Sequence, residues 1–204
     1  MIPEAHKLTR TGHPHLDRRW ESDGPDKRNS HYRRKYYHYA YLFAKKFQPE
    51  VVVELGIDEG DCCGHWAAGN PTTQVYGIDV HKDSERPSEL CREVERNFPN
   101  FHYLRGWTWD RVKDIKALNK PVDVLFIDSW HTLDYLARDW NDYHVFLKKG
   151  SVVLVDDLNM GLMPVFEKLP GQKFVDNTLA ISIGIAVYDG SPCVIPFQKQ
   201  DFMP

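Results

Sequence analysis

The sequence has few cysteines, and their spacing does not resemble a disulfide framework. Only four of the 204 residues are cysteine; Cys62 and Cys63 are adjacent, and Cys91 and Cys193 stand far from them. Small secreted domains held together by disulfides carry more cysteines in a short chain. We therefore expect free thiols and a cytoplasmic protein.

Long apolar runs and charge of a single sign are also absent. No run approaches the ~18–20 apolar residues of a membrane-spanning helix, and the N-terminal segment shows no apolar signal region. The 26 basic and 29 acidic residues are spread along the chain and give a net charge of -3. Such a balance does not favour a polyanionic partner. We expect neither a membrane nor a nucleic acid as partner.

The N-terminal part divides into an arm and a helix. Residues 1–29 are rich in Pro, Gly, His and charge without apolar periodicity, which predicts an irregular arm ahead of a single domain, residues 30–204. From Ser30 to Pro49 aromatic residues recur at helical spacing, which predicts an amphipathic helix. Its tyrosines and basic residues would suit RNA, a packed aromatic face or a substrate lid. The arm or this helix could support a homo-oligomer.

Short apolar runs then alternate with helical patterns. The predicted strands are 51–55, 74–79, 101–105, 122–128 and 151–157, and the predicted helices are 61–69, 87–97, 108–118 and 132–147. Strands that are apolar on both faces and separated by helices are typical of a parallel sheet covered on both sides. Segments 172–178 and 181–190 leave little room for a helix between them and predict an antiparallel pair. The fold class is therefore a doubly wound, mostly parallel α/β sheet.

The first strand ends in a glycine loop, VVVELGIDEGD, which contains Glu54, Gly56 and Gly60. Ligands bind at the carboxyl ends of such strands, where glycine lets them approach the backbone. No G-K-[ST] phosphate loop and no G-x-G-x-x-G dinucleotide motif is present. Asp79 ends the second strand, where a carboxylate can accept two ribose hydroxyl groups. A tight turn with a solvated glutamate, and a plain turn aspartate, are the structural alternatives.

With these motifs the chain resembles the class I S-adenosylmethionine-dependent methyltransferases. The resemblance implies a seven-stranded Rossmann-like sheet with an antiparallel C-terminal hairpin, and S-adenosylmethionine as cofactor. It places Gly56 and Gly60 beside the methionine part of the cofactor, with Glu54 supporting the loop and Asp79 at the ribose. Asp58 stands where many members have a second glycine, and the catechol-type O-methyltransferases also lack that glycine.

The resemblance covers roughly residues 30–190 and includes the third loop, RGWTWD. Gly106 follows the predicted strand there, and the indole groups of Trp107 and Trp109 could flank the adenine. Thr108 or Asp110 could cap the next helix. Packing alone is the alternative explanation for either tryptophan.

Acidic residues follow two more predicted strands. Asp128 ends VDVLFID, and Asp156 and Asp157 end SVVLVDD, so parallel strands would bring all three to one sheet edge. Neighbouring carboxylates repel one another unless a cation compensates, and Mg²⁺ or another hard divalent cation prefers such oxygen ligands. Helix capping and loop contacts are the structural alternative for each aspartate.

This segment looks like the metal motif of catechol O-methyltransferase. The resemblance assigns Asp128 and Asp156 to the metal, with Asp157 at the position of the amide ligand; Asp128 and Ser129 also fall at the cofactor edge. His131 occupies the position of the catalytic lysine, as in bacterial metal-dependent sugar O-methyltransferases and cephalosporin-hydroxylase-type relatives, which implies a base. A neutral imidazole can take a hydroxyl proton near neutral pH. A capping or core histidine, or a metal ligand, remains the alternative.

The function expected from these motifs is S-adenosylmethionine-dependent O-methylation of a small hydroxylated substrate, using a divalent metal and a histidine base. A sugar, a catechol or another polyol would each fit. Two other functions stay open: a non-catalytic cofactor-binding or assembly protein of the same fold, and a nucleic-acid methyltransferase. For a nucleic-acid methyltransferase, the chain lacks the N/D-P-P-Y/F signature and a strongly basic composition.

Overall fold

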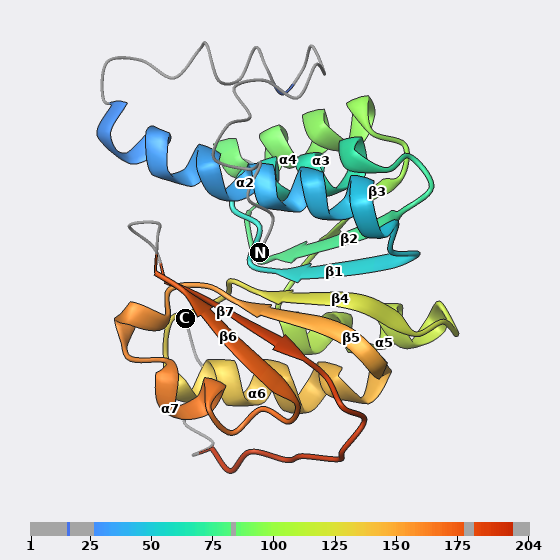
Figure 1. Ribbon diagram of the computed structural model, residues 1–204. Coiled ribbons are helices and arrows are strands. Elements are labelled where there is room, and N and C mark those ends of the chain that lie inside the picture. Colours follow the sequence, from blue (N-terminus) through green and yellow to red (C-terminus); the bar gives the residue numbers. More distant parts are fainter. Residues whose placement is uncertain (1–15, 17–26, 83–84, 178–181, 198–204) are drawn as a thin grey trace.

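The structure is a computed structural model that describes residue 16 and residues 27–82, 85–177 and 182–197. It contains a seven-stranded sheet in the order β3-β2-β1-β4-β5-β7-β6 (Figure 1). The strands are β1 (Val51–Leu55), β2 (Gln74–Asp79), β3 (Phe101–Arg105), β4 (Val122–Ile127), β5 (Leu147–Val155), β6 (Gln172–Asp176) and β7 (Ile183–Val187). The first five strands are parallel and β7 is antiparallel to both β5 and β6. The predicted fold class and C-terminal hairpin are confirmed.

Helices cover both faces of the sheet. One face carries α2 (Lys27–Phe47), α3 (Asp61–Gly69) and α4 (Arg86–Asn97), and the other carries α5 (Thr108–Ala117), α6 (Leu133–Tyr143) and α7 (Met163–Phe166) (Figure 1). Two short 3-10 helices, η2 (His144–Phe146) and η3 (Leu158–Met160), flank β5. None of the helices among the described residues is long and apolar enough to cross a membrane.

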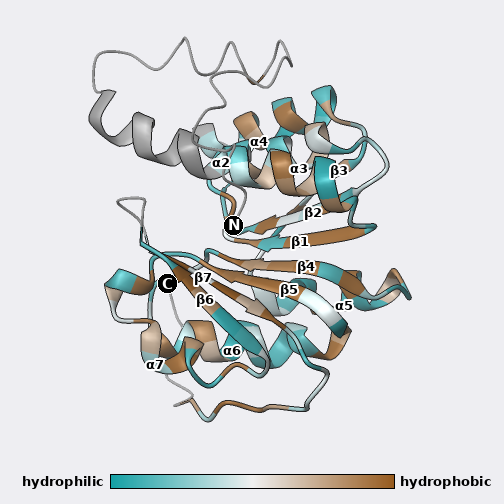
Figure 2. Ribbon diagram, in the orientation of Figure 1, coloured by the Kyte–Doolittle hydropathy of each residue, from teal (hydrophilic) through white to brown (hydrophobic). Residues whose placement is uncertain are grey.

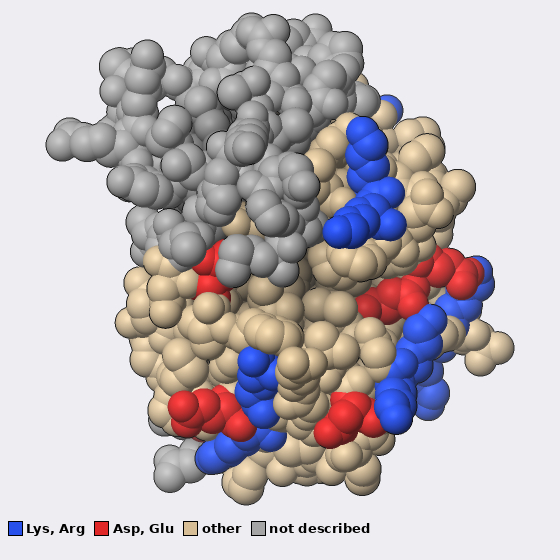
Figure 3. Space-filling view, viewed as in Figure 1, with Lys and Arg blue, Asp and Glu red and all other residues tan. Residues whose placement is uncertain are grey.

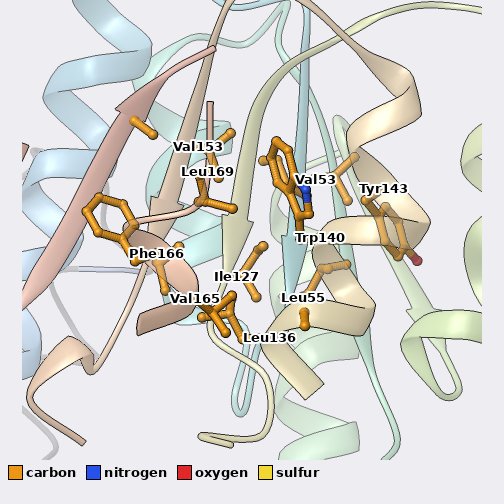
Figure 4. Packing of buried hydrophobic residues seen from close by; sticks show 14 of the residues in the cluster. Val53, Leu55, Ile127, Leu136, Trp140, Tyr143, Val153, Val165, Phe166 and Leu169 are labelled. Atoms are coloured by element: carbon orange, nitrogen blue, oxygen red, sulfur yellow. The ribbon is translucent and has the colours of Figure 1, made fainter. Parts of the chain in front are cut away.

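Two hydrophobic clusters fill the space between the sheet and its helices, and apolar colour predominates in the central strands (Figure 2). All five residues of β1 are buried. Because side chains alternate along a strand, Val53 and Leu55 join the cluster under α6, while Val52 joins the cluster under α3. Trp140 of α6 lies at the centre of the first cluster (Figure 4). Each such large side chain contributes ~1.5–3 kcal/mol through burial.

Most predicted boundaries agree with the structure within three residues, but the long helix predicted over 132–147 is wrong at its end. Helix α6 ends at Tyr143, and β5 begins at Leu147. The run Lys148-Lys149-Gly150 belongs to β5, at an irregular register between β4 and β5. There the Ser151 hydroxyl accepts from Lys148 N and donates to Val122 O. The basic residues and glycine thus mark an irregular strand start and not a helix end.

The parallel register brings the carboxyl ends of five strands to one edge. Leu55 pairs with both Ile78 and Ile127, and Ile127 also pairs with Val155. The loops that follow β1, β2, β3, β4 and β5 therefore surround one region.

All four cysteines are free, as predicted. On the face seen in Figure 3, outside its grey atoms, basic and acidic side chains are interspersed.

Candidate functional site

A cavity of about 520 Å³ lies at this carboxyl edge. Its walls come from the loops after β1 to β5, with Tyr37 of α2 and Tyr135 of α6 added. Thirteen of the sequence-predicted site residues line it: Glu54, Gly56, Asp58, Asp79, Gly106, Trp107, Thr108, Trp109, Asp128, Ser129, His131, Asp156 and Asp157. Gly60 does not. The structure thus brings together residues as far apart in sequence as Glu54 and Asp157.

The glycine loop needs glycine for two different reasons. Gly56 has φ 79°, and a methyl group on its Cα would lie 2.1 Å from Asp128 O and 2.7 Å from Ser129 Cα. The loops after β1 and β4 therefore touch backbone to backbone. Gly60 has φ 78° and precedes α3, with Cys91 Sγ 3.3 Å from the corresponding methyl position. It shapes the turn beneath the cavity and does not line it.

Asp79 braces the glycine loop. Its Oδ2 accepts hydrogen bonds from the backbone of Ile57 at 2.8 Å and of Asp58 at 2.9 Å. Its Oδ1 accepts from Val80 N at 2.6 Å and lies 3.4 Å from His81 Nε2. The carboxylate is therefore not a plain turn residue, because it joins the end of β2 to the loop after β1. Its predicted contact with a ribose remains a prediction.

Glu54 is buried and lines the cavity, with 1% of its surface exposed, so the alternative of a solvated glutamate is wrong. Burial raises the pKa of Glu54 to about 8, and hydrogen bonds from the thiols of Cys62 and Cys63 offset only part of that effect. The Cys63 thiol lies 3.4 Å from Glu54 Oε2. At neutral pH a neutral carboxyl group therefore sits beneath the glycine loop.

Aromatic side chains form another wall of the cavity. The indoles of Trp107 and Trp109 are stacked, with ring centroids 4.8 Å apart and planes at 7°. The Arg138 guanidinium lies 3.6 Å from the centroid of Trp109, a cation–π contact. Tyr135 stacks on Trp130 at 5.5 Å. Both predicted tryptophans face the cavity, and Trp130 continues the wall to the exposed rim.

The predicted acidic constellation and the histidine lie together at the same cavity. His131 Nε2 is 3.4 Å from Asp128 Oδ1 and 3.2 Å from Asp157 Oδ2. Burial, reinforced by the charges of Asp128 and Asp157, raises the pKa of Asp156 to about 8. Asp156 Oδ1 is buried without a hydrogen-bond partner. Among the described residues, however, no three His, Cys, Asp or Glu side chains form a ready coordination shell.

The cap predicted at Thr108 or Asp110 is wrong, and so is the capping alternative for His131. The hydroxyl of Thr132 caps α6 by accepting from Tyr135 N at 3.4 Å, so His131 does not serve as the cap. Thr108 is the first residue of α5 and makes no cap; its hydroxyl donates to Asp139 at 2.6 Å. His131 is instead half-buried and faces the two aspartates. The core alternative for His131 is also wrong, because about a third of its side chain (32%) is exposed.

Several lining residues were missed by the sequence reasoning. Val80 and His81 follow Asp79 directly, so the strand-end signal could have included them. Tyr135 lies in the first turn of α6, four residues after His131, so it too is close to the end of β4. Tyr37 had no local signal, because only the packing of α2 brings it to the cavity. Asp139, in the middle of α6, does not line the cavity, but it contacts two lining residues, Thr108 and Ser129, and was missed for the same reason.

This chain is similar to known proteins at low sequence identity. An uncharacterized protein of Acanthamoeba polyphaga mimivirus is 22% identical over 129 residues, 60% of this chain; the chain spans 58% of that viral protein. A Podospora anserina methyltransferase bound to SAH aligns over 85% of this chain and 88% of its own, with a TM-score of 0.64 and 15% identity. At this level of identity, the structural likeness to the Podospora enzyme shows the fold alone.

Two O-methyltransferase structures align over a somewhat smaller part. The enzyme from Bacillus cereus in complex with SAH has a TM-score of 0.58 and 14% identity over 73% of this chain and 79% of its own. The Streptomyces achromogenes enzyme of tomaymycin synthesis, in complex with SAM, has a TM-score of 0.59 and 15% identity over 74% and 78%.

A family model places the chain more directly. The model described as a methyltransferase domain matches residues 53–158, just over half of the chain. The match begins in β1 and ends in η3, so it contains the loops that build most of the cavity. The chain therefore belongs to the methyltransferase domain family and has the class I fold of S-adenosylmethionine-dependent methyltransferases.

Proposed function

We propose that this protein is an S-adenosylmethionine-dependent O-methyltransferase that methylates a hydroxyl group of a small molecule, with His131 as the base and a divalent cation held by acidic residues. The observation that carries the proposal is one cavity lined by the glycine loop, Asp79, the tryptophan pair and the group formed by His131 and three aspartates. The residues proposed to bind the cofactor and those proposed to take part in the reaction thus line the same cavity. The O-methyltransferases of the same fold that are bound to SAM or SAH support this reading.

The cofactor would lie along the loops after β1, β2 and β3, with Ser129 of the loop after β4 at their edge. Gly56 lines the cavity and lets the loops after β1 and β4 meet, and Asp79 holds the glycine loop in place through Ile57 N and Asp58 N. Trp107 offers an apolar ring face suited to a purine. When bound, S-adenosylmethionine supplies the electrophilic methyl group of the reaction.

The acceptor would lie near His131. A neutral imidazole can remove the hydroxyl proton as the oxygen attacks. Asp128 Oδ1 and Asp157 Oδ2, 3.4 and 3.2 Å from His131 Nε2, would stabilise the imidazolium that forms. The chain thus contributes a proton acceptor and its electrostatic support from two adjacent loops.

The donor chemistry fits a hard divalent cation such as Mg²⁺. Asp128, Asp156 and Asp157 offer only oxygen ligands, and Asp156 Oδ1 is buried without a partner. As these side chains stand they do not form a coordination shell, so the cation is a proposal that needs its own test. When bound, such a cation would acidify the acceptor hydroxyl and orient it.

The test is a methyl-transfer screen with the purified chain. S-adenosylmethionine would be offered with catechols, sugars and other polyols, with Mg²⁺, Mn²⁺ or excess chelator, and SAH formation would be followed by mass spectrometry. We expect at least one hydroxylated acceptor to be methylated in a metal-dependent manner. Transfer that persists in excess chelator would remove the cation from the proposal. Binding of SAH without transfer to any acceptor would instead favour the non-catalytic alternative.

A further inference from the structure

A buried carboxylate that does not line the cavity connects two of the segments that do. Asp139 of α6 has none of its surface exposed. Its Oδ1 accepts a hydrogen bond from the Thr108 hydroxyl at 2.6 Å, and its Oδ2 accepts from the Ser129 hydroxyl. Thr108 begins α5 and Ser129 follows β4, and both line the cavity. One side chain outside the cavity thus engages the hydroxyl groups of two residues that line it.

The environment of these two loops is fixed on other sides as well. One turn after Asp139, the Tyr143 hydroxyl donates to Thr108 O at 2.6 Å. Ser129 Cα lies against Gly56, 2.7 Å from where a methyl group on that glycine would stand. Helix α6 therefore holds Thr108 by its side chain and by its carbonyl group, and Ser129 cannot shift toward the glycine loop.

The direction of the two hydrogen bonds follows from chemistry. A carboxylate has no hydrogen, so each hydroxyl must donate to Asp139. A hydroxyl group has only one hydrogen, and in both residues Asp139 engages it. What either oxygen can still offer a ligand is a lone pair, that is, an acceptor.

We propose that Asp139 is a specificity-determining residue: by holding the Thr108 and Ser129 hydroxyl groups as donors to itself, it makes this part of the cavity select a ligand edge that carries hydrogen-bond donors, such as the amino group of adenine. The inference rests on the proposed function, since it takes an adenosyl ligand as the occupant. A ring with an oxo group at the same position would bring acceptor against acceptor.

The ionised form of Asp139 is the one that sets this polarity. Burial raises the pKa of Asp139 to about 6, while the hydrogen bonds from Ser129 and Thr108 act in the opposite direction. Measurements at pH 8 therefore observe the carboxylate.

Calorimetry with two ligands tests the proposal. S-adenosylhomocysteine and S-inosylhomocysteine differ in the amino or oxo group of the purine. We expect the wild-type chain to bind the adenine form at least about ten-fold more tightly, the range of a mismatched buried hydrogen bond. In Asp139→Asn the amide NH₂ donates to one hydroxyl and frees its hydrogen for the ligand, so the preference should fall to about three-fold or less.

Two further variants distinguish an effect on hydrogen-bond direction from a general loss of structure. Asp134→Asn makes the same substitution in the first turn of α6, at a residue that does not line the cavity, and should keep the wild-type preference. Ser129→Ala removes one acceptor, leaves Asp139 in place and should also lower the preference, which covers the case in which Asp139→Asn does not fold. Equal binding of both ligands by the wild type, or an unchanged preference in the folded variants, would overturn the inference alone. If the wild type binds neither ligand, the proposed function fails as well.

Discussion

Replacement of Gly56 by alanine tests the contact between the loops after β1 and β4. The added methyl group would lie 2.1 Å from Asp128 O and 2.6 Å from its carbonyl carbon, both backbone atoms that cannot rotate away. The left-handed φ of 79° adds strain of its own. That strain costs about 1–2 kcal/mol, and overpacking against a fixed neighbour adds about 1–3 kcal/mol. We expect Gly56→Ala to lower the free energy of unfolding by about 3 kcal/mol.

Two glycines provide matched controls. Gly161 has φ 90° and nothing within 4 Å of its methyl position, so Gly161→Ala should show the strain alone. Gly171 has φ 100°, and a methyl group there would lie 1.9 Å from Val187 O, away from the cavity. Gly171→Ala should therefore be as destabilising as Gly56→Ala but leave ligand affinity intact.

Thermal and urea unfolding with SAH titration provide the assay. In a chain of this size 1 kcal/mol shifts Tm by roughly 2–4 °C, so Gly56→Ala should melt about 6–12 °C lower and Gly161→Ala, with the strain alone, about 2–8 °C lower. Of the three variants, only Gly56→Ala should also lose SAH affinity. Equal losses of stability in Gly56→Ala and Gly161→Ala would refute the backbone contact inferred here.

Three more predictions concern the residues at the cavity. His131→Ala should lower turnover by about 10²–10⁴-fold with little change in cofactor affinity, and His102→Ala, outside the cavity, should not; a lower Tm with full turnover would make His131 structural. Asp128→Asn or Asp156→Asn should abolish metal-dependent turnover while SAH still binds, and unchanged metal dependence would exclude these ligands. Because folding raises the pKa of Glu54 from 4.5 to about 8, its stabilising contribution is complete below pH 4.5 and is lost as pH rises toward 8. In chelator, Glu54→Gln should flatten the decline of unfolding free energy between pH 5.5 and 7.5 by about 1 kcal/mol per pH unit, and parallel curves would contradict the buried acid.

The strand pattern could be predicted from sequence because the parallel strands are apolar on both faces. All of β1 is buried, and the run VVVEL shows this locally. The start of β5 could not be predicted, because its irregular pairing depends on the Ser151 hydroxyl and Val122 O, which come from different strands. Basic residues followed by glycine signal a helix end only where no strand partner is available.

The candidate site shows a similar division. Acidic residues and glycines at the ends of predicted strands can be assigned to the site from sequence, since the carboxyl ends of parallel strands meet at one edge. The state of those acids depends on tertiary packing: Glu54 is buried beside two thiols, and Asp79 is occupied by the amides of the glycine loop. Asp139 carries no motif, and only the packing of α6 against Thr108 and Ser129 gives it a role.

Calorimetric titration of SAH into the wild-type chain tests the central claim most directly. The account predicts saturable binding of one ligand per chain, weakened in Asp79→Ala by the ~1.5–3 kcal/mol of hydrogen bonds to a charged group. S-adenosylmethionine should bind in the same way. A folded chain that binds neither ligand at millimolar concentration would contradict the assignment of the cavity to this cofactor.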